Sequence, residues 1–157
     1  MINVQGSIIV TKDISTVFDY FSDLRNDKTW RKEINATSLS TARPEAGSIV
    51  TEHSFLSKRV PDYVTVLVCT TFRQNDTAVY QTQPGNPFFL QTTRKVQQAS
   101  PATVSLQYQL VFSKAIVQHG LGVQLPALLV TWFTTYTLKK YLAQLKTILE
   151  QGHPLSR

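Results

Sequence analysis

The sequence predicts an α+β domain in which a curved antiparallel sheet of about seven strands wraps around one long C-terminal helix, with two short helices after the first strand. Two observations lead to this prediction. Between residues 34 and 113, short runs of β-branched and apolar residues alternate with polar, hairpin-length turns. After residue 125 the apolar residues recur with a helical period, so the helix needs a surface that buries its apolar stripe.

Length and composition indicate one folded domain over residues 1–157. A hydrophobic fraction of 42% and a charged fraction of 17% are typical of a globular protein rather than a disordered one. Cys69 is the only cysteine, so no intrachain disulfide can form. It stands within an apolar run, which predicts a buried thiol rather than a reactive one.

The ends and the charge pattern argue against several classes of protein. Residues 1–13 lack the basic and cleavable apolar regions of a secretion signal, and the apolar run 125–133 is too short to span a bilayer. We therefore expect a cytoplasmic protein with no transmembrane segment. The formal charge is +6, and residues 77–157 carry seven basic side chains against Glu150 alone. Because these basic residues are scattered, nucleic-acid binding is not expected.

The first strand is predicted over residues 4–12, and a helix follows over residues 15–24, with Ser15 as its N-terminal cap. The apolar residues on one face of this helix have the i, i+3, i+4, i+7 spacing: Ile14, Val17, Phe18, Phe21 and Leu24. A short helical turn is expected over residues 26–31. Asp23, Asn26 and Asp27 are expected to be caps and turn formers, and Trp30 a core anchor.

Six more strands are predicted over residues 34–42, 48–56, 62–72, 77–83, 88–97 and 103–113. Proline and glycine mark two of the turns between them, 43–47 and 84–87. The last strand has the clearest pattern, because apolar residues at even positions alternate mostly with polar ones. The apolar set is Val104, Leu106, Tyr108, Leu110 and Phe112.

A glycine-containing connection, residues 119–122, leads to the long helix, where Pro126 suits the first turn. The apolar stripe of this helix is predicted to contain Leu125, Leu128, Trp132, Thr135, Leu138, Leu142, Leu145 and Leu149. Gly152 and Pro154 are expected to mark its end.

This order of elements, together with a V-F-x-x-x-x-D-x-x-N-D-x-x-W pattern from Val17 to Trp30, resembles the START/polyketide cyclase-dehydrase superfamily, also called SRPBCC or helix-grip. Lys28 replaces the more usual proline before the tryptophan. The resemblance covers nearly the whole chain. It implies an apolar cavity between sheet and helix that binds lipids, sterols, polyketides or hormones, and in some members cyclises or dehydrates them. A shared fold does not assign one substrate or reaction.

Alternation along the last two strands and the helical period predict which residues line this cavity. The expected set is Phe88, Leu90, Thr92, Arg94, Leu106, Tyr108, Leu110, Leu128, Trp132 and Thr135. An arginine such as Arg94 on an apolar face needs a carboxylate partner, or is available to a ligand's carboxylate or phosphate. A one-residue slip in register would instead turn it to solvent.

Candidate acid/base residues are few. Glu52 and His53 are consecutive and so point to opposite faces of their strand, which leaves one of them able to face the cavity. The three histidines, His53, His119 and His153, have no metal-ligand spacing, and no phosphate-binding loop or nucleophile motif is present. Neither a metal nor a cofactor is expected.

The leading hypothesis is binding or transport of a small hydrophobic ligand in the cavity. The first alternative is a cyclase or dehydratase that moves protons through His53, Glu52, Arg94 or a pocket tyrosine. The second is a partner-binding module that uses the groove rim and the basic C-terminal half. A homodimer is a further possible assembly.

Overall fold

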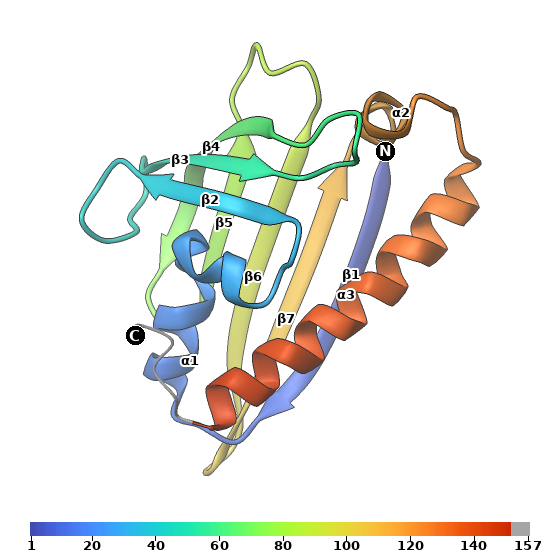
Figure 1. The fold of residues 1–157 in the computed structure, drawn as a ribbon. Helices are drawn as coiled ribbons and strands as arrows, with labels where there is room; N and C mark the ends of the chain where they lie inside the picture. Colours follow the sequence, from blue (N-terminus) through green and yellow to red (C-terminus); the bar gives the residue numbers. More distant parts are fainter. Residues whose placement is uncertain (152–157) are drawn as a thin grey trace.

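The computed structural model describes residues 1–151. Seven antiparallel strands form one sheet in the order β1-β7-β6-β5-β4-β3-β2. The strands are β1 (Ile2–Val10), β2 (Ile34–Leu39), β3 (Ile49–Ser54), β4 (Tyr63–Arg73), β5 (Thr77–Thr82), β6 (Leu90–Ser100) and β7 (Thr103–Phe112). The sheet is strongly curled, with β2 and β3 running across the direction of β6, β7 and β1 (Figure 1). The predicted α+β helix-grip architecture is confirmed.

The register of β6 and β7 places the expected residues on the inner face of the sheet. Arg94 on β6 lies opposite Tyr108 on β7, and Tyr108 in turn lies opposite Gly6 on β1. Thr92, Arg94 and Val96 are buried, whereas Lys95, which lies between Arg94 and Val96, is exposed. Side chains therefore alternate between the core and solvent as a period of two requires.

Two short helical elements follow β1, namely α1 (Ile14–Phe21) and η1 (Leu24–Thr29). The expected cap was wrong by two residues, because the helix begins at Ile14 and Asp13 is its N-cap. The Asp13 carboxylate accepts the backbone N–H of Thr16 at 3.0 Å. Ser15 stands two positions after the N-cap, already inside the first turn.

The connection between β7 and the long helix contains a helix that the sequence pattern did not reveal, α2 (Ala115–Leu121). It ends at Gly122, whose φ of 78° is the left-handed conformation that glycine adopts without strain. Seven residues are too few for helical periodicity to stand out. In Figure 1, α2 lies near the N-terminus of the chain, beside one end of the sheet.

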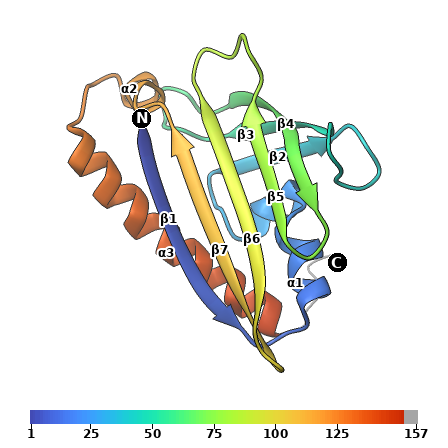
Figure 2. The same ribbon diagram turned by 180° about the vertical axis from the view of Figure 1, so that it is seen from behind.

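The long helix is α3 (Ala127–Glu150), and its C-terminal half packs on the sheet. Gly6 makes this contact possible, because a Cβ there would lie 2.5 Å from Leu138 Cδ2. The predicted stripe is confirmed where the helix packs, at Leu138, Leu142, Leu145 and Leu149. Figure 2 shows the opposite face of β1, β7 and β6, over which no helix of the described chain lies.

The N-terminal half of α3 differs from the prediction. Leu128 is 86% exposed and Trp132 is 65% exposed, while Val130 is the buried residue of this half. The predicted stripe followed the largest apolar side chains of the helix. In its N-terminal half, however, no strand packs against Leu128 and Trp132. Gly152 and Pro154, expected to end the helix, lie outside the described residues. Within residues 1–151, no helix is both long and apolar enough to cross a membrane.

Candidate functional site

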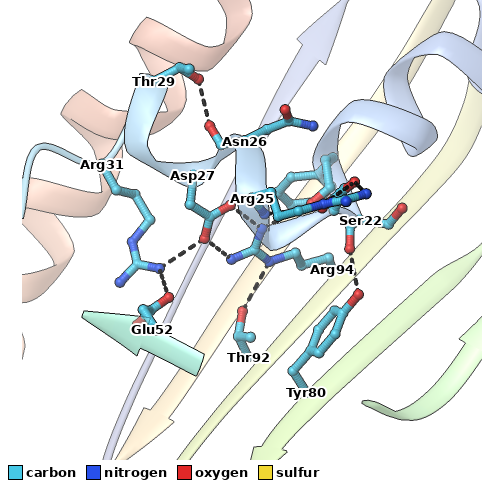
Figure 3. A network of polar contacts seen from close by, with 12 residues as sticks. Ser22, Arg25, Asn26, Asp27, Thr29, Arg31, Glu52, Tyr80, Thr92 and Arg94 are labelled. Carbon is cyan, nitrogen blue, oxygen red and sulfur yellow. Dashed lines mark hydrogen bonds and ion pairs between the residues drawn. The ribbon is translucent and has the colours of Figure 1, made fainter. Parts of the chain in front are cut away.

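The inner part of the space between sheet and helices holds a buried ion pair. Arg94 on β6 donates from Nη1 and Nη2 to the two carboxylate oxygens of Asp27, each at 2.6 Å (Figure 3). Its Nη1 also donates to the carbonyl of Phe21 at 2.9 Å, and its Nε donates to Thr92 Oγ1 at 3.3 Å. The guanidinium is therefore committed to protein partners and has no open space beside it.

Aromatic rings enclose the same guanidinium. Arg94 Cζ lies between 5.2 and 5.5 Å from the ring centroids of Tyr108, Phe21 and Trp30. Cation–π attraction strengthens when the charge is removed from water, as it is here. These rings fill the core beneath η1.

The expected role of Asp27 as a turn former was wrong. Asp27 lies inside η1 and is fully buried, because the short turn directs its carboxylate toward β6. Its neighbours do what was expected of them. The Asp23 carboxylate accepts the backbone N–H of Arg25, and Asn26 Nδ2 donates to the Tyr20 carbonyl at 3.1 Å.

A second arginine, which the sequence pattern did not single out, extends the ion pair toward the surface. Arg31 donates from Nη1 to Asp27 at 2.9 Å and to Glu52 at 3.4 Å, and from Nη2 to Glu33 at 3.0 Å. We call these five residues, Asp27, Arg31, Glu33, Glu52 and Arg94, the ionic cluster. The cluster contains two guanidinium groups and three carboxylates, joined by four ion pairs.

The positions of Glu52 and His53 resolve which of them faces inward. Glu52 is buried in the cluster, whereas His53 lies on the outer face with its Nδ1 3.0 Å from Asp62. Burial raises the pKa of Glu52, and the charge of Arg31 only partly offsets this effect. Because Asp27 and Glu33 already balance the two guanidinium charges, a third carboxylate gains less from them.

An apolar groove lies beside the cluster, at the N-terminal half of α3. It has a volume of about 550 Å³ and is bordered by α2, α3 and the segment after β3. Its apolar lining comes from Phe55, Leu56, Ile116, Val117, Leu121, Leu125, Leu129, Val130, Trp132 and Phe133. Among the described residues that line the groove there is no lysine or arginine.

One end of the groove is polar. Glu33 and Tyr141 are the ionisable residues of its lining, and Glu33 connects the groove to the cluster through Arg31. Burial acts to raise the pKa of Glu33, but the Arg31 charge and the Tyr141 hydroxyl bring it below its usual range. Burial and the charge of Glu33 raise the pKa of Tyr141. Near neutral pH, Glu33 is thus a carboxylate and Tyr141 a neutral phenol.

The residues expected to line a cavity are divided between four places. Trp132 borders the groove. Thr92, Arg94, Leu106 and Tyr108 are buried in the packed core, and Leu90 and Leu110 pack partly buried against it. Phe88 contacts the rings of Tyr63 and His119. Leu128 and Thr135 lie on α3 outside the groove lining. The reason is that side chains and the ionic cluster fill the space directly under the sheet.

Sequence reasoning did not single out Arg31, Glu33 and Tyr141. A usable signal was the run Arg31-Lys32-Glu33 just after Trp30, in which alternate charges precede a strand and so share one face. Among the described residues, no group of three or more His, Cys, Asp and Glu is arranged to hold a metal ion.

Comparisons with known proteins agree with the fold. No protein family model matches the chain, and no curated protein matches its sequence. A START superfamily protein from Mycobacterium smegmatis superposes with a TM-score of 0.72 at 16% identity, covering 96% of this chain and 99% of that one. A protein of Deinococcus radiodurans gives a TM-score of 0.71 at 8% identity, with 96% and 99% covered.

A third solved structure, the di-domain ARO/CYC BexL from the BE-7585A biosynthetic pathway, matches with a TM-score of 0.64 at 14% identity. This chain is covered to 97%, and it spans 50% of that protein. Identities this low show the fold and nothing about the ligand. The chain has a START-like, helix-grip fold, as the sequence resemblance implied.

Proposed function

We propose that the protein binds a small, largely apolar molecule in the groove between α2 and the N-terminal half of α3. The observation that carries this proposal is the apolar lining left open to solvent, in which Trp132 and Phe133 are both more than half exposed. Covering such surface is worth about 25 cal/mol for each Å² removed from water. A ligand that fills the groove would gain this free energy.

The size of the groove suits this role. Its volume of about 550 Å³ falls within the range of small-molecule sites, roughly 300–1,000 Å³. A mostly apolar wall with a few polar groups at one end is also usual for such sites, because the polar groups orient the ligand. Glu33 and Tyr141 supply those groups here.

The cyclase or dehydratase alternative has less support. An acid/base catalyst must reach the bound molecule and titrate near the working pH. Glu52 and Arg94 are buried in the ionic cluster, and His53 faces outward. In the groove itself, the pKa of Glu33 is lowered and that of Tyr141 is raised, so both keep one protonation state near neutral pH. These observations favour binding over proton transfer.

The partner-binding alternative is favoured by the exposed apolar side chains at the rim of the groove. Leu128 is exposed on α3 beside the lining residue Leu129 but is not itself part of the lining. Tyr136 stacks on Trp132 with ring centroids 6.1 Å apart. The homodimer likewise stays a prediction.

Ligand binding can be tested by titrating a neutral fluorescent probe, N-phenyl-1-naphthylamine, and by native mass spectrometry of the protein with saturating decanol. We expect a fluorescence increase that saturates and a mass shift of one ligand. Phe133→Ala should weaken probe binding about fivefold or more, because it removes lining surface. Leu128→Ala is the matched control on the same helix and should bind as the wild type does. Absence of probe binding and of any mass shift would overturn the proposal.

A further inference from the structure

We infer that the groove selects apolar molecules that end in a hydroxyl group and discriminates against those that end in a carboxylate. This inference rests on the proposed function, since it names the ligand class of the same groove. It is carried by the polar end of the groove and by the charges behind it.

The polar end presents a hydrogen-bond acceptor that is only partly used. The Glu33 side chain is 30% exposed, and its Oε2 accepts from Arg31 at 3.0 Å. Its Oε1 accepts no hydrogen bond from any described residue and has almost no accessible surface, so a ligand reaches it only when the Glu33 side chain turns toward the groove. The Tyr141 hydroxyl lies near enough to lower the pKa of Glu33, but it does not make a well-aligned hydrogen bond with Oε1. An ionised carboxylate can only accept, so a partner here must donate.

Within residues 1–151, no lysine or arginine lines the groove, and the two guanidinium groups behind Glu33 are already paired. Asp27 binds Arg94 through both of its oxygens, and Arg31 is shared by Asp27, Glu52 and Glu33. A carboxylate at this end would meet the like charge of Glu33, and the neutral Tyr141 hydroxyl would be the one side chain of the ionisable pair able to donate to it. Like charges close together in a poorly solvated site repel strongly. A ligand hydroxyl carries no charge, so Glu33 does not repel it, and it can donate a hydrogen bond to the Glu33 carboxylate.

A neutral donor also fits the location of this acceptor. Glu33 precedes β2, and Tyr141 lies beyond Thr137 along α3, so both stand at the end of the groove next to the ionic cluster. A chain-like ligand would therefore place its head group against them and its tail between Ile116, Leu129 and Phe133.

The test is competition between decanol and decanoate, which share one tail length, for displacement of N-phenyl-1-naphthylamine near neutral pH. We expect decanol to displace the probe at a concentration at least about tenfold lower than decanoate. Glu33→Gln keeps the shape but removes the charge, so the two competitors should then differ by less than about threefold. Glu45→Gln, an exposed site in the turn before β3, is the matched control and should keep the wild-type ratio.

Tyr141→Phe provides a second variant that keeps the ring and loses only the hydroxyl. It should weaken decanol more than it weakens the probe. If decanoate competes as well as decanol in the wild type, or if Glu33→Gln binds the probe but leaves the ratio unchanged, the inference is overturned while the proposed function stands. If the probe does not bind the wild type at all, the proposed function itself has failed.

Discussion

Arg94 and Asp27, 67 residues apart in the sequence, form a bidentate ion pair with no exposed side-chain surface on either residue. The pair joins β6, an inner strand of the sheet, to η1, which closes one end of the curl. Removing one partner of such a pair leaves the other charge buried and uncompensated. The pair therefore holds the two layers in one arrangement, and it occupies the space that a deeper cavity would need.

The first prediction concerns this ion pair. Arg94→Met should lower the free energy of unfolding by about 3–5 kcal/mol, because Asp27 keeps a buried charge with Arg31 as its remaining partner. The double variant Arg94→Met with Asp27→Leu should recover part of the loss. Urea denaturation followed by circular dichroism measures both values.

The control for this experiment is a surface ion pair, Arg73 with Asp76, whose side chains are more than half exposed. Arg73→Met should change the free energy of unfolding by no more than about 1 kcal/mol. Equal losses at Arg73 and Arg94 would contradict the structural role of the buried pair.

The second prediction concerns the pH dependence of stability that Glu52 produces. Its pKa in the folded protein is above the ordinary value of 4.5, so the folded state binds the proton more tightly than the unfolded state does. The contribution of Glu52 is thus present in full below pH 4.5 and is lost as the pH rises through the folded pKa. The free energy of unfolding of the wild type, minus that of Glu52→Gln, should fall over this window.

The difference between the two proteins isolates Glu52, because Glu33 contributes with the opposite sign to both of them. The pKa of Glu33 is lowered, so its contribution is present above its ordinary pKa and is lost as the pH falls. Denaturation at a series of pH values measures the difference curve. A curve that rises with pH, or stays flat, would show that Glu52 does not titrate as a buried acid.

The third prediction concerns the contact between β1 and α3. Gly6→Ala should lower the free energy of unfolding by about 1–3 kcal/mol, because the added methyl group would overlap Leu138 Cδ2 and press on Leu142. Ser7→Ala, the next residue on the opposite face, is the control and should have a much smaller effect. A Gly6→Ala variant as stable as the wild type would mean that α3 can move away from the sheet without cost.

Local patterns were sufficient for most of the elements. The alternation through Leu106 and Tyr108 predicted both a strand and its buried face, and both predictions are confirmed. The apolar spacing of Val17, Phe18 and Phe21 predicted α1 and the side that it buries. In each case neighbours in the sequence are also neighbours on one face, so the period alone carries the information.

The candidate site was predicted less well. Trp132 borders the groove, but the expected role of Asp27 was wrong, and Arg31, Glu33 and Tyr141 were not singled out. Arg94 was expected to need a carboxylate or to meet a ligand, and only its distance to Asp27 decides between these outcomes. Pairing between residues far apart in the chain leaves no local pattern.

The sequence by itself determined the helix-grip fold, because the periods of strands and helices are local properties of the chain. Tertiary structure decided where open space remains. In the C-terminal half of α3, Leu138 and Leu142 meet the sheet, so the stripe read from the sequence is the buried one. In the N-terminal half no strand lies opposite, so Trp132 and Phe133 stay exposed around a groove. Burial depends on what lies across from a residue, and that is set by the whole fold.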